Sequence, residues 1–292
     1  MTGTIIKAIS SFYYVDTDNG VYECKARGIF KHKNRQLFVG DCVTISVIDE
    51  ETKKGNVIEM SDRKNLLKRP PIANVSQVIS VFSVKNPDPN LSLIDRFLVL
   101  AQRQRLSIVI VLNKLDIDNG LAEQIKECYL PLGYPVILIS ATEDEDLDHI
   151  RELLHGHISV VAGPSGVGKS TLINALIETD LKTGDISEKI GRGRHTTRYV
   201  ELIKIDEDSY IADTPGFSSI DLNELDLYEL KEEFIEFHDH DPLCRFGAKC
   251  LHENEPGCQV KEAVENKLIS SVRYMSYIQL LNEIRENKRR AY

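Results

Sequence analysis

The residues most informative about the fold are Ile158-Ser159-Val160-Val161-Ala162-Gly163-Pro164-Ser165-Gly166-Val167-Gly168-Lys169-Ser170-Thr171. An apolar, β-branched run ends in Gly-x-x-x-x-Gly-Lys-Ser, and apolar residues then follow at helical spacing. This order predicts a strand, a glycine-rich loop and the start of a helix. Inward-facing backbone N–H groups and the positive end of a helix dipole together attract phosphate. The stretch therefore predicts a phosphate-binding loop.

Individual residues of this loop have expected tasks once a nucleoside triphosphate is bound. We expect Lys169 to reach the β- and γ-phosphates and Ser170 to ligate Mg²⁺. A chance glycine turn between strand and helix is the structural alternative, which the Lys-Ser pair in register disfavours. The predicted nucleotide-binding residues here are Gly163, Pro164, Ser165, Gly166, Val167, Gly168, Lys169, Ser170 and Thr171.

A second apolar run, at residues 108–112, leads into Asn113-Lys114-Leu115-Asp116. Such unbroken runs are typical of strands buried on both faces of a parallel sheet, where ligands bind at the carboxyl ends. A carboxylate at Asp116 can accept two hydrogen bonds from guanine, whereas adenine would leave this acceptor unpaired. We therefore expect Asn113, Lys114 and Asp116 to recognise guanine. The alternative is a helix cap that follows a core strand.

Two further strand ends complete the predicted site. Residues 136–139 lead into Ser140-Ala141, whose small side chains let backbone N–H groups approach the guanine oxygen. The strand at residues 209–212 leads into Asp213-Thr214-Pro215-Gly216. Asp213 would hold Mg²⁺ through water, and the Gly216 N–H would meet the γ-phosphate. Four segments are thus expected to converge on one Mg²⁺-bound GTP.

The order of these segments is unusual. Familiar GTPases have the phosphate loop first, then Asp-x-x-Gly, then Asn-Lys-x-Asp, then Ser-Ala. Here the last two precede the first two, which indicates a circular permutation. A doubly wound sheet tolerates this change because the site depends on where strand ends meet in space. The chain then enters its C-terminal region directly after Asp-x-x-Gly.

Residues 180–198 lack apolar periodicity and contain Gly193-Arg194-His195-Thr196-Thr197. We expect a loop that orders around the γ-phosphate, with Thr196 or Thr197 as second Mg²⁺ ligand and Thr197 preferred. Phe217 follows Asp-x-x-Gly where Ras-type proteins carry a water-orienting Gln. His195 is the candidate to position the water instead; anchoring the loop or touching RNA is the alternative. Turnover by the chain alone is expected at roughly 10⁻⁴ to 10⁻² s⁻¹.

Residues 1–68 contain short alternating segments separated by turns. They predict strands at 3–10, 12–16, 21–26, 38–39, 43–48 and 55–59, and a small closed barrel of the OB-fold type, which commonly binds RNA. Two basic clusters, at residues 31–35 and around Arg63-Lys64 and Lys68-Arg69, could hold phosphates or could simply be solvated. Pro70-Pro71 is expected to end this domain as a stiff linker.

Near the C-terminus stands Cys244-x5-Cys250-x-His252-x5-Cys258. Three thiolates and one imidazole suit a closed, tetrahedral, structural Zn²⁺ site, with free thiols as the alternative. Residues 260–291 show approximately helical apolar spacing and a basic end. We expect one structural zinc ion, held in a mainly helical domain.

The whole chain has 292 residues, 6 cysteines and a formal net charge of −9. The length suggests about two or three domains, and the charge argues against wholesale coating of nucleic acid. The N-terminus lacks the apolar core of a signal peptide, and no run approaches the length of a membrane span. We expect a cytoplasmic protein with no membrane partner.

The barrel, the permuted nucleotide segments and the Cys-x5-Cys-x-His-x5-Cys module together resemble the bacterial ribosome small-subunit-dependent GTPase A (RsgA, also called YjeQ) family. The predicted fold is thus multidomain: an OB-fold β-barrel RNA-binding domain at 1–68, a circularly permuted α/β P-loop GTPase domain at 72–222 and a zinc-binding, mainly helical domain at 223–292.

The resemblance implies a late maturation factor for the 30S ribosomal subunit and its 16S rRNA. Such a factor hydrolyses GTP to GDP and phosphate when the 30S subunit stimulates it, and then dissociates. We expect a monomer. The alternative function is a guanine-nucleotide-controlled RNA-binding module in which hydrolysis is incidental.

Overall fold

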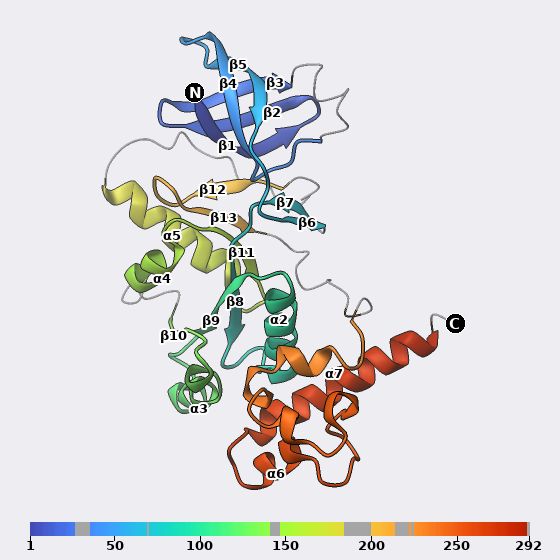
Figure 1. Ribbon diagram of the computed structural model, residues 1–292. Coiled ribbons are helices and arrows are strands. Elements are labelled where there is room, and N and C mark those ends of the chain that lie inside the picture. Colours follow the sequence, from blue (N-terminus) through green and yellow to red (C-terminus); the bar gives the residue numbers. More distant parts are fainter. Residues whose placement is uncertain are drawn as a thin grey trace. The chain divides into compact units, whose positions relative to one another are not determined.

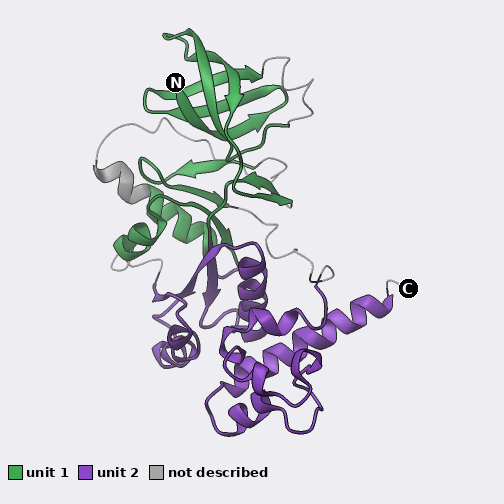
Figure 2. Cartoon of the chain, in the orientation of Figure 1, with its two compact units in different colours: residues 1–77, 141–162, 169–217 green, residues 78–140, 163–168, 218–292 purple. Residues whose placement is uncertain are grey.

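The computed structural model describes residues 1–26, 36–68, 70–140, 147–183, 200–213, 222 and 225–290 (Figure 1). The chain divides into two compact units, each made of separate stretches of sequence (Figure 2). Unit 1 comprises residues 1–77, 141–162 and 169–217. Unit 2 comprises residues 78–140, 163–168 and 218–292.

A closed five-stranded barrel opens unit 1. Its strands are joined in the order β1-β2-β3-β5-β4, with β3 and β5 parallel and the other pairs antiparallel. This is the expected OB-type barrel. Alternate side chains of the strands point inward and form an apolar core. The strands are β1 (Thr2–Ile9), β2 (Phe12–Thr17), β3 (Gly20–Ala26), β4 (Cys42–Asp49) and β5 (Lys54–Met60).

The segment after the barrel differs from the expectation. The second proline begins β7 (Pro71–Ala73), which pairs antiparallel with β6 (Leu66–Lys68). Proline is tolerated at the first position of a short edge strand, where no N–H donor is needed. The expected strand at residues 38–39 is reduced to a single bridge between Val39 and Ile72. The linker therefore carries a small ladder of its own.

Unit 1 also holds three strands and two helices of the nucleotide-binding region. β11 (Ile158–Ala162) pairs parallel with β13 (Tyr210–Asp213), and β12 (Leu202–Lys204) pairs antiparallel with β13. The helices are α4 (Leu147–Leu154) and α5 (Lys169–Thr183), and Arg151 of α4 donates to the Leu176 carbonyl oxygen of α5 at 2.7 Å. β11 thus leads toward the phosphate loop, as its apolar run predicts.

The barrel contacts the β12–β13 hairpin inside unit 1. Asp16 of β2, which is buried, accepts a hydrogen bond from the Tyr210 hydroxyl at 2.7 Å and lies 2.8 Å from Lys204 Nζ. Lys7 of β1 pairs with Glu201 at 2.9 Å, and the two residues also form a backbone bridge. Ionic and backbone contacts therefore join the barrel to the hairpin.

Unit 2 contains the remaining strands of the α/β region. β9 (Ser107–Asn113) lies between β8 (Gln77–Ser83) and β10 (Val136–Leu138), and it pairs parallel with β10. All seven residues of β8 are buried, including the polar Gln77, Ser80 and Ser83, as is typical of a strand covered on both faces of a sheet. Helices α2 (Leu91–Arg103) and α3 (Asn119–Tyr129) begin at side-chain caps from Asn90 and Asp118.

The C-terminal part of unit 2 consists of short turns followed by two helices. The turns are η5 (Leu230–Glu233), η6 (Ile235–Phe237), η7 (Asp241–Leu243) and η8 (Gly247–Lys249). The expected helical region is divided into α6 (Gln259–Glu265) and α7 (Ser271–Arg290). Lys267, at φ +61°, lies in the interruption. A left-handed residue ends a helix because it turns the chain out of the helical path.

A buried ionic cluster attaches α7 to α2. Arg273, which is 1% exposed, contacts Asp95 of α2 and forms two hydrogen bonds to Glu236, at 2.7 and 2.9 Å. Its guanidinium carbon lies 4.8 Å from the centre of the Phe234 ring. Bidentate pairing and ring stacking are contacts that suit arginine's planar group. The C-terminal turns and helices are thereby packed against the α/β part of unit 2.

Candidate nucleotide site and metal centre

Asn113 connects the predicted base-recognition segment to the predicted phosphate loop. Its buried amide donates from Nδ2 to the Val167 carbonyl oxygen at 2.8 Å, and its Oδ1 accepts the Lys114 backbone N–H at 2.7 Å. β9 delivers Asn113 at its carboxyl end, which is where ligands bind in open parallel sheets. Two segments 54 residues apart in the sequence are thus held together by one side chain.

Two positions of the phosphate loop require glycine for two reasons: φ is positive, and a neighbouring atom occupies the space that a Cβ would need. At Gly168, φ is +95° and a Cβ would lie 2.2 Å from Asn113 Nδ2. At Gly163, φ is +144° and a Cβ would lie 2.1 Å from the Val81 carbonyl oxygen of β8. A larger residue at Gly163 would collide with backbone, and one at Gly168 would displace the Asn113 amide from its hydrogen bond to Val167. The loop pattern therefore reflects packing against β8 and β9.

Asp116 and Ser140 also meet in unit 2. The Ser140 hydroxyl donates to Asp116 Oδ1 at 3.1 Å, and the Leu115 N–H donates to the Ile139 carbonyl oxygen at 3.1 Å. Ser140 orients the Asp116 carboxylate. Because Asp116 is exposed, this carboxylate still faces solvent. This is the arrangement that a carboxylate needs in order to accept hydrogen bonds from a base.

A loop that the motif analysis did not single out lies beside these residues. Lys114 Nζ donates to the Asn86 carbonyl oxygen, and the Ser83 hydroxyl donates to the Pro87 carbonyl oxygen at 2.7 Å. A Cβ built on Gly166 would lie 3.8 Å from Pro87 Cδ. The loop after β8 therefore adjoins both the base-recognition segment and the phosphate loop. Its only sequence signal is a pair of prolines, which marks a turn and predicts no ligand.

The other predicted nucleotide residues lie as follows. Lys169, Ser170 and Thr171 form the first turn of α5, directly after Gly168. Asp213 ends β13, and its backbone pairs with Val161 of β11. Ala141, His195, Thr196, Thr197 and Gly216 lie outside the described residues. Their predicted roles stay predictions.

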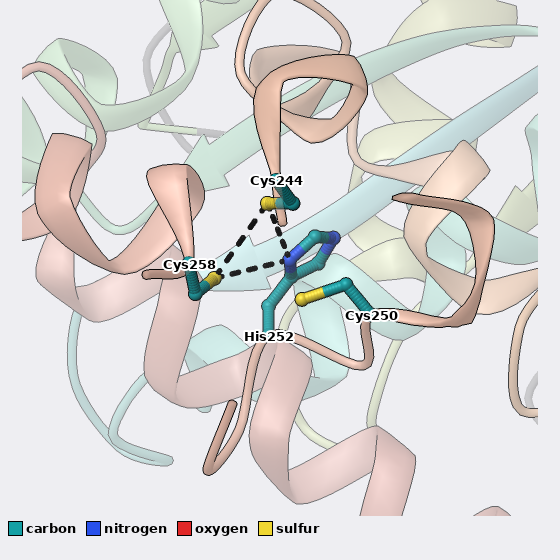
Figure 3. A group of neighbouring side chains, drawn as sticks. All are labelled: Cys244, Cys250, His252 and Cys258. Carbon is teal, nitrogen blue, oxygen red and sulfur yellow. Dashed lines mark hydrogen bonds between the residues drawn. The ribbon is translucent and has the colours of Figure 1, made fainter. Parts of the chain in front are cut away.

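The four predicted metal ligands are gathered in the C-terminal part of unit 2. The ligand atoms of Cys244, Cys250, His252 and Cys258 all lie within 4.8 Å of one another, and all four residues are buried (Figure 3). Cys244 Sγ is 3.9 Å from Cys258 Sγ, and His252 Nδ1 is 3.7 and 3.3 Å from these two sulfurs. Ordinary Zn–S and Zn–N bonds in a tetrahedron give edges of about 3.8 Å (S–S) and about 3.6 Å (S–N). The donor set and its spacing therefore fit a zinc ion.

Burial controls the protonation of this cluster. It raises the pKa of the Cys250 thiol to about 12 and, despite the nearby Asp241, lowers the pKa of His252. The lowered pKa favours the neutral imidazole, which can offer a lone pair, while a metal ion would have to displace protons from the thiols. An N–H donor, from Gln259, also lies 3.3 Å from Cys244 Sγ and would stabilise thiolate charge there.

One predicted phosphate-binding residue has a structural task instead. Arg63 forms a bidentate pair with the buried carboxylate of Asp41, at 2.6 and 2.7 Å, and its guanidinium carbon lies 4.9 Å from the centre of the Phe38 ring. Its neighbour Lys64 is exposed. Of this adjacent pair, Lys64 is the more exposed residue. The first basic cluster, at residues 31–35, lies outside the described residues.

The fold and the strand-end segments define the class of protein: a circularly permuted P-loop GTPase, an enzyme that hydrolyses GTP. Comparison with known proteins gives the family. The family model for the RsgA GTPase matches residues 60–223, and that for the RsgA N-terminal domain matches residues 2–57. This chain belongs to the RsgA family.

Curated relatives match nearly end to end. A protein of Alkaliphilus metalliredigens named small ribosomal subunit biogenesis GTPase RsgA is 47% identical over 98% of this chain and 99% of its own length. A Clostridium perfringens protein of the same name is 47% identical over 97% of this chain and 98% of its own length.

Two solved structures share the fold. YjeQ from Thermotoga maritima has a TM-score of 0.82 at 38% identity. The match covers 97% of this chain and 98% of the YjeQ chain. YloQ, described as a circularly permuted GTPase, has a TM-score of 0.80 at 36% identity. The match covers 98% of this chain and 95% of the YloQ chain. These comparisons agree with the permutation inferred from motif order. In the part of the chain that the structure describes, no helix has both the length and the apolar character needed to cross a bilayer.

Proposed function

We propose that this chain acts in the cytoplasm on the 30S ribosomal subunit, assists its late maturation, hydrolyses GTP when the subunit stimulates it, and then dissociates as a monomer. The observation that supports the proposal is the Asn113–Val167 hydrogen bond, which joins the predicted base-recognition segment to residues 163–168 within unit 2. Relatives named for small ribosomal subunit biogenesis match this chain nearly end to end.

The nucleotide site is proposed to work mainly by positioning and charge stabilisation, as in other phosphoryl-transfer sites. Asp116 accepts hydrogen bonds from guanine, and the backbone of residues 163–168 holds the phosphates. Lys169 neutralises the β- and γ-phosphates. Ser170 and Thr197 are the proposed Mg²⁺ ligands, Asp213 acts on the ion through water, and the Gly216 N–H meets the γ-phosphate.

His195 is proposed to position the attacking water, since Phe217 cannot form a hydrogen bond with it. The proposal predicts that His195→Ala removes the stimulation by 30S subunits and leaves nucleotide affinity near that of the wild type. Unchanged stimulated hydrolysis would reject this assignment and favour a loop-anchoring or RNA-contacting histidine.

The metal centre is proposed to be structural. Three buried thiols and one imidazole fill a tetrahedron, so a bound Zn²⁺ would have no position for a reacting water. The ion would instead hold the turns between Cys244 and Cys258 in one shape. The basic last turn of α7, which contains Lys288, Arg289 and Arg290, and the barrel would provide contacts to 16S rRNA.

Ser170→Ala tests whether hydrolysis times release. Loss of the hydroxyl spoils Mg²⁺ placement, so the variant should bind 30S subunits and stay on them longer than the wild type. Sedimentation of 30S particles with GTP measures the retained fraction. Ser61→Ala, which changes an exposed serine of unit 1, is the matched control. Equal retention of Ser170→Ala and wild type would favour an RNA-binding module in which the nucleotide is only a brace.

A further inference from the structure

The two ring nitrogens of His252 face different groups. Nδ1 points at the sulfurs of Cys244 and Cys258, and the other ring nitrogen points away from them (Figure 3). That second nitrogen, Nε2, lies 3.0 Å from Asp241 Oδ1. Among the described residues, Nε2 has no hydrogen-bond partner with good alignment. Asp241 Oδ1 is nevertheless within hydrogen-bond distance of it, although an N–H on Nε2 would not point straight at this oxygen.

Asp241 is itself held by a buried cation. Its Oδ1, the same oxygen that approaches His252, lies 2.7 Å from Lys231 Nζ, and the Lys231 side chain is 2% exposed. Buried lysines are costly unless paired, so this ammonium fixes the carboxylate and balances its charge. The backbone of Asp241 also begins η7, and its carbonyl oxygen accepts the Cys244 N–H at 3.0 Å. Asp241 is thus tied to two of the metal ligands.

The backbone around His252 is restrained by other contacts. Its φ is +56°, a conformation uncommon for a residue with a side chain. The Tyr274 hydroxyl donates to the His252 carbonyl oxygen at 2.6 Å, and the Tyr277 hydroxyl donates to the Leu251 carbonyl oxygen at 2.8 Å. These hydrogen bonds from α7 fix the position of the backbone that carries the His252 side chain. They do not decide which nitrogen carries the proton.

We propose that Asp241 is a positioning residue of the metal centre, which holds the proton of His252 on Nε2 and so reserves the Nδ1 lone pair for the ion. Neutral imidazole exists as two tautomers, and a partner on one nitrogen selects the form that leaves the other available. Carboxylates that accept from a ligand histidine orient the ring and increase its basicity. The inference rests on the proposed occupancy of this centre by zinc.

The test compares the full-length, zinc-loaded wild type with Asp241→Ala, Asp241→Asn and Asp239→Ala. The asparagine variant keeps an oxygen that accepts the Nε2 proton but removes the charge. Asp239 is a neighbouring exposed carboxylate and serves as the matched control. Zinc affinity is measured by competition with a chromophoric chelator. The ¹⁵N shifts of the imidazole report which nitrogen is protonated and which one binds zinc.

We expect Asp241→Ala to lose about 10- to 100-fold in zinc affinity, the range found when the partner of a ligand histidine is removed. Asp241→Asn should recover part of this loss and keep the wild-type ¹⁵N pattern, while Asp239→Ala should match the wild type. Asparagine also restores the volume of the side chain, so it is the ¹⁵N pattern of Asp241→Ala that separates tautomer selection from a general loss of packing.

Two results would overturn the inference. One is an Asp241→Ala variant with wild-type affinity and the same ¹⁵N pattern. The other is a wild type that binds zinc through Nε2. If Asp241→Ala does not fold, Asp241→Asn alone decides, since unaltered Nδ1 ligation with Nε2 protonated supports the proposal and any other pattern rejects it. A wild-type protein that retains no zinc would instead reject the proposed occupancy.

Discussion

Among single residues, Gly168 and Arg63 each depend on one contact with a distant segment, Gly168 with Asn113 and Arg63 with Asp41. Residue spacing predicts Gly168, Asn113 and Asp116 as nucleotide-binding residues. It did not predict that Gly168 is required because Asn113 Nδ2 occupies the space of a Cβ. It also could not distinguish Arg63, which pairs with Asp41, from the exposed Lys64 beside it. Arg63 and Lys64 carry the same charge but differ in their contacts, because Arg63 pairs with the buried carboxylate of Asp41 and Lys64 is exposed.

Gly168→Ala should abolish nucleotide binding and lower stability by about 1–3 kcal/mol, the usual cost of a strained backbone. The methyl group would meet Asn113 Nδ2 at 2.2 Å and break its bond to Val167. Fluorescent GDP titration and denaturant unfolding measure the two effects. Gly133→Ala is the control, because Gly133 also has positive φ, +84°, but has open space around it. Equal behaviour of the two variants would contradict the collision.

Asp116→Asn should shift preference from GTP toward xanthosine triphosphate. The amide presents a donor where the carboxylate presented an acceptor, and xanthine has a carbonyl oxygen where guanine has an amino group. Competition against a fluorescent guanine nucleotide measures the change. Asp118→Asn, two residues further on, should leave the preference alone, since asparagine caps α3 as well as aspartate does. An unshifted Asp116→Asn variant would remove the base assignment.

At the scale of elements, hydrophobic periodicity and turn residues predicted the strands and helices that surround the site. The apolar run at residues 108–112 became the interior of β9, and the helical spacing after the phosphate loop became α5. Two expectations differed, at Pro71 and at the break between α6 and α7. Both depend on how a segment meets its neighbours, which local spacing does not record. The attachment of α7 to α2 through Arg273 was likewise absent from the sequence reading.

Arg273→Met should destabilise the protein by about 3–5 kcal/mol, because it leaves the carboxylates of Asp95 and Glu236 buried without a counter-charge. Denaturant unfolding measures the loss. The control is Arg285→Met on the same helix, where Arg285 is 27% exposed and pairs with a partly exposed Glu253. That variant should lose no more than about 1 kcal/mol. A similar small loss for Arg273→Met would show that the buried cluster contributes little.

At the scale of the whole molecule, motif order was the most informative feature. The Asn-Lys-x-Asp segment precedes the phosphate loop in this chain, and the comparison with a circularly permuted GTPase agrees with that order. The domain boundaries at residues 68, 72 and 222 remain predictions. In unit 1 the barrel joins the β12–β13 hairpin through Asp16, Tyr210 and Lys204. The barrel is therefore in contact with the hairpin that leads to Asp213.

Binding to 30S subunits should weaken with salt, and Lys64→Gln should reduce the slope of log affinity against log salt by about 0.7–0.9, the value of one phosphate contact. Arg63→Gln should instead cost about 1–3 kcal/mol of stability, because Asp41 loses its partner. Salt titration of 30S binding and denaturant unfolding separate the two effects. An unchanged slope for Lys64→Gln would place the RNA contact elsewhere.

Local patterns in the sequence were enough to predict a phosphate loop, a guanine motif, their permuted order and a set of three cysteines and one histidine as metal ligands. These features are local, because backbone angles, ligand types and strand or helix periods are specified within a few neighbouring residues. Tertiary structure alone decided that Asn113 bonds to Val167, that Arg63 serves Asp41 and that Asp241 faces His252. Such contacts depend on packing between distant segments, and a side chain's partner is set by which surfaces the fold brings together.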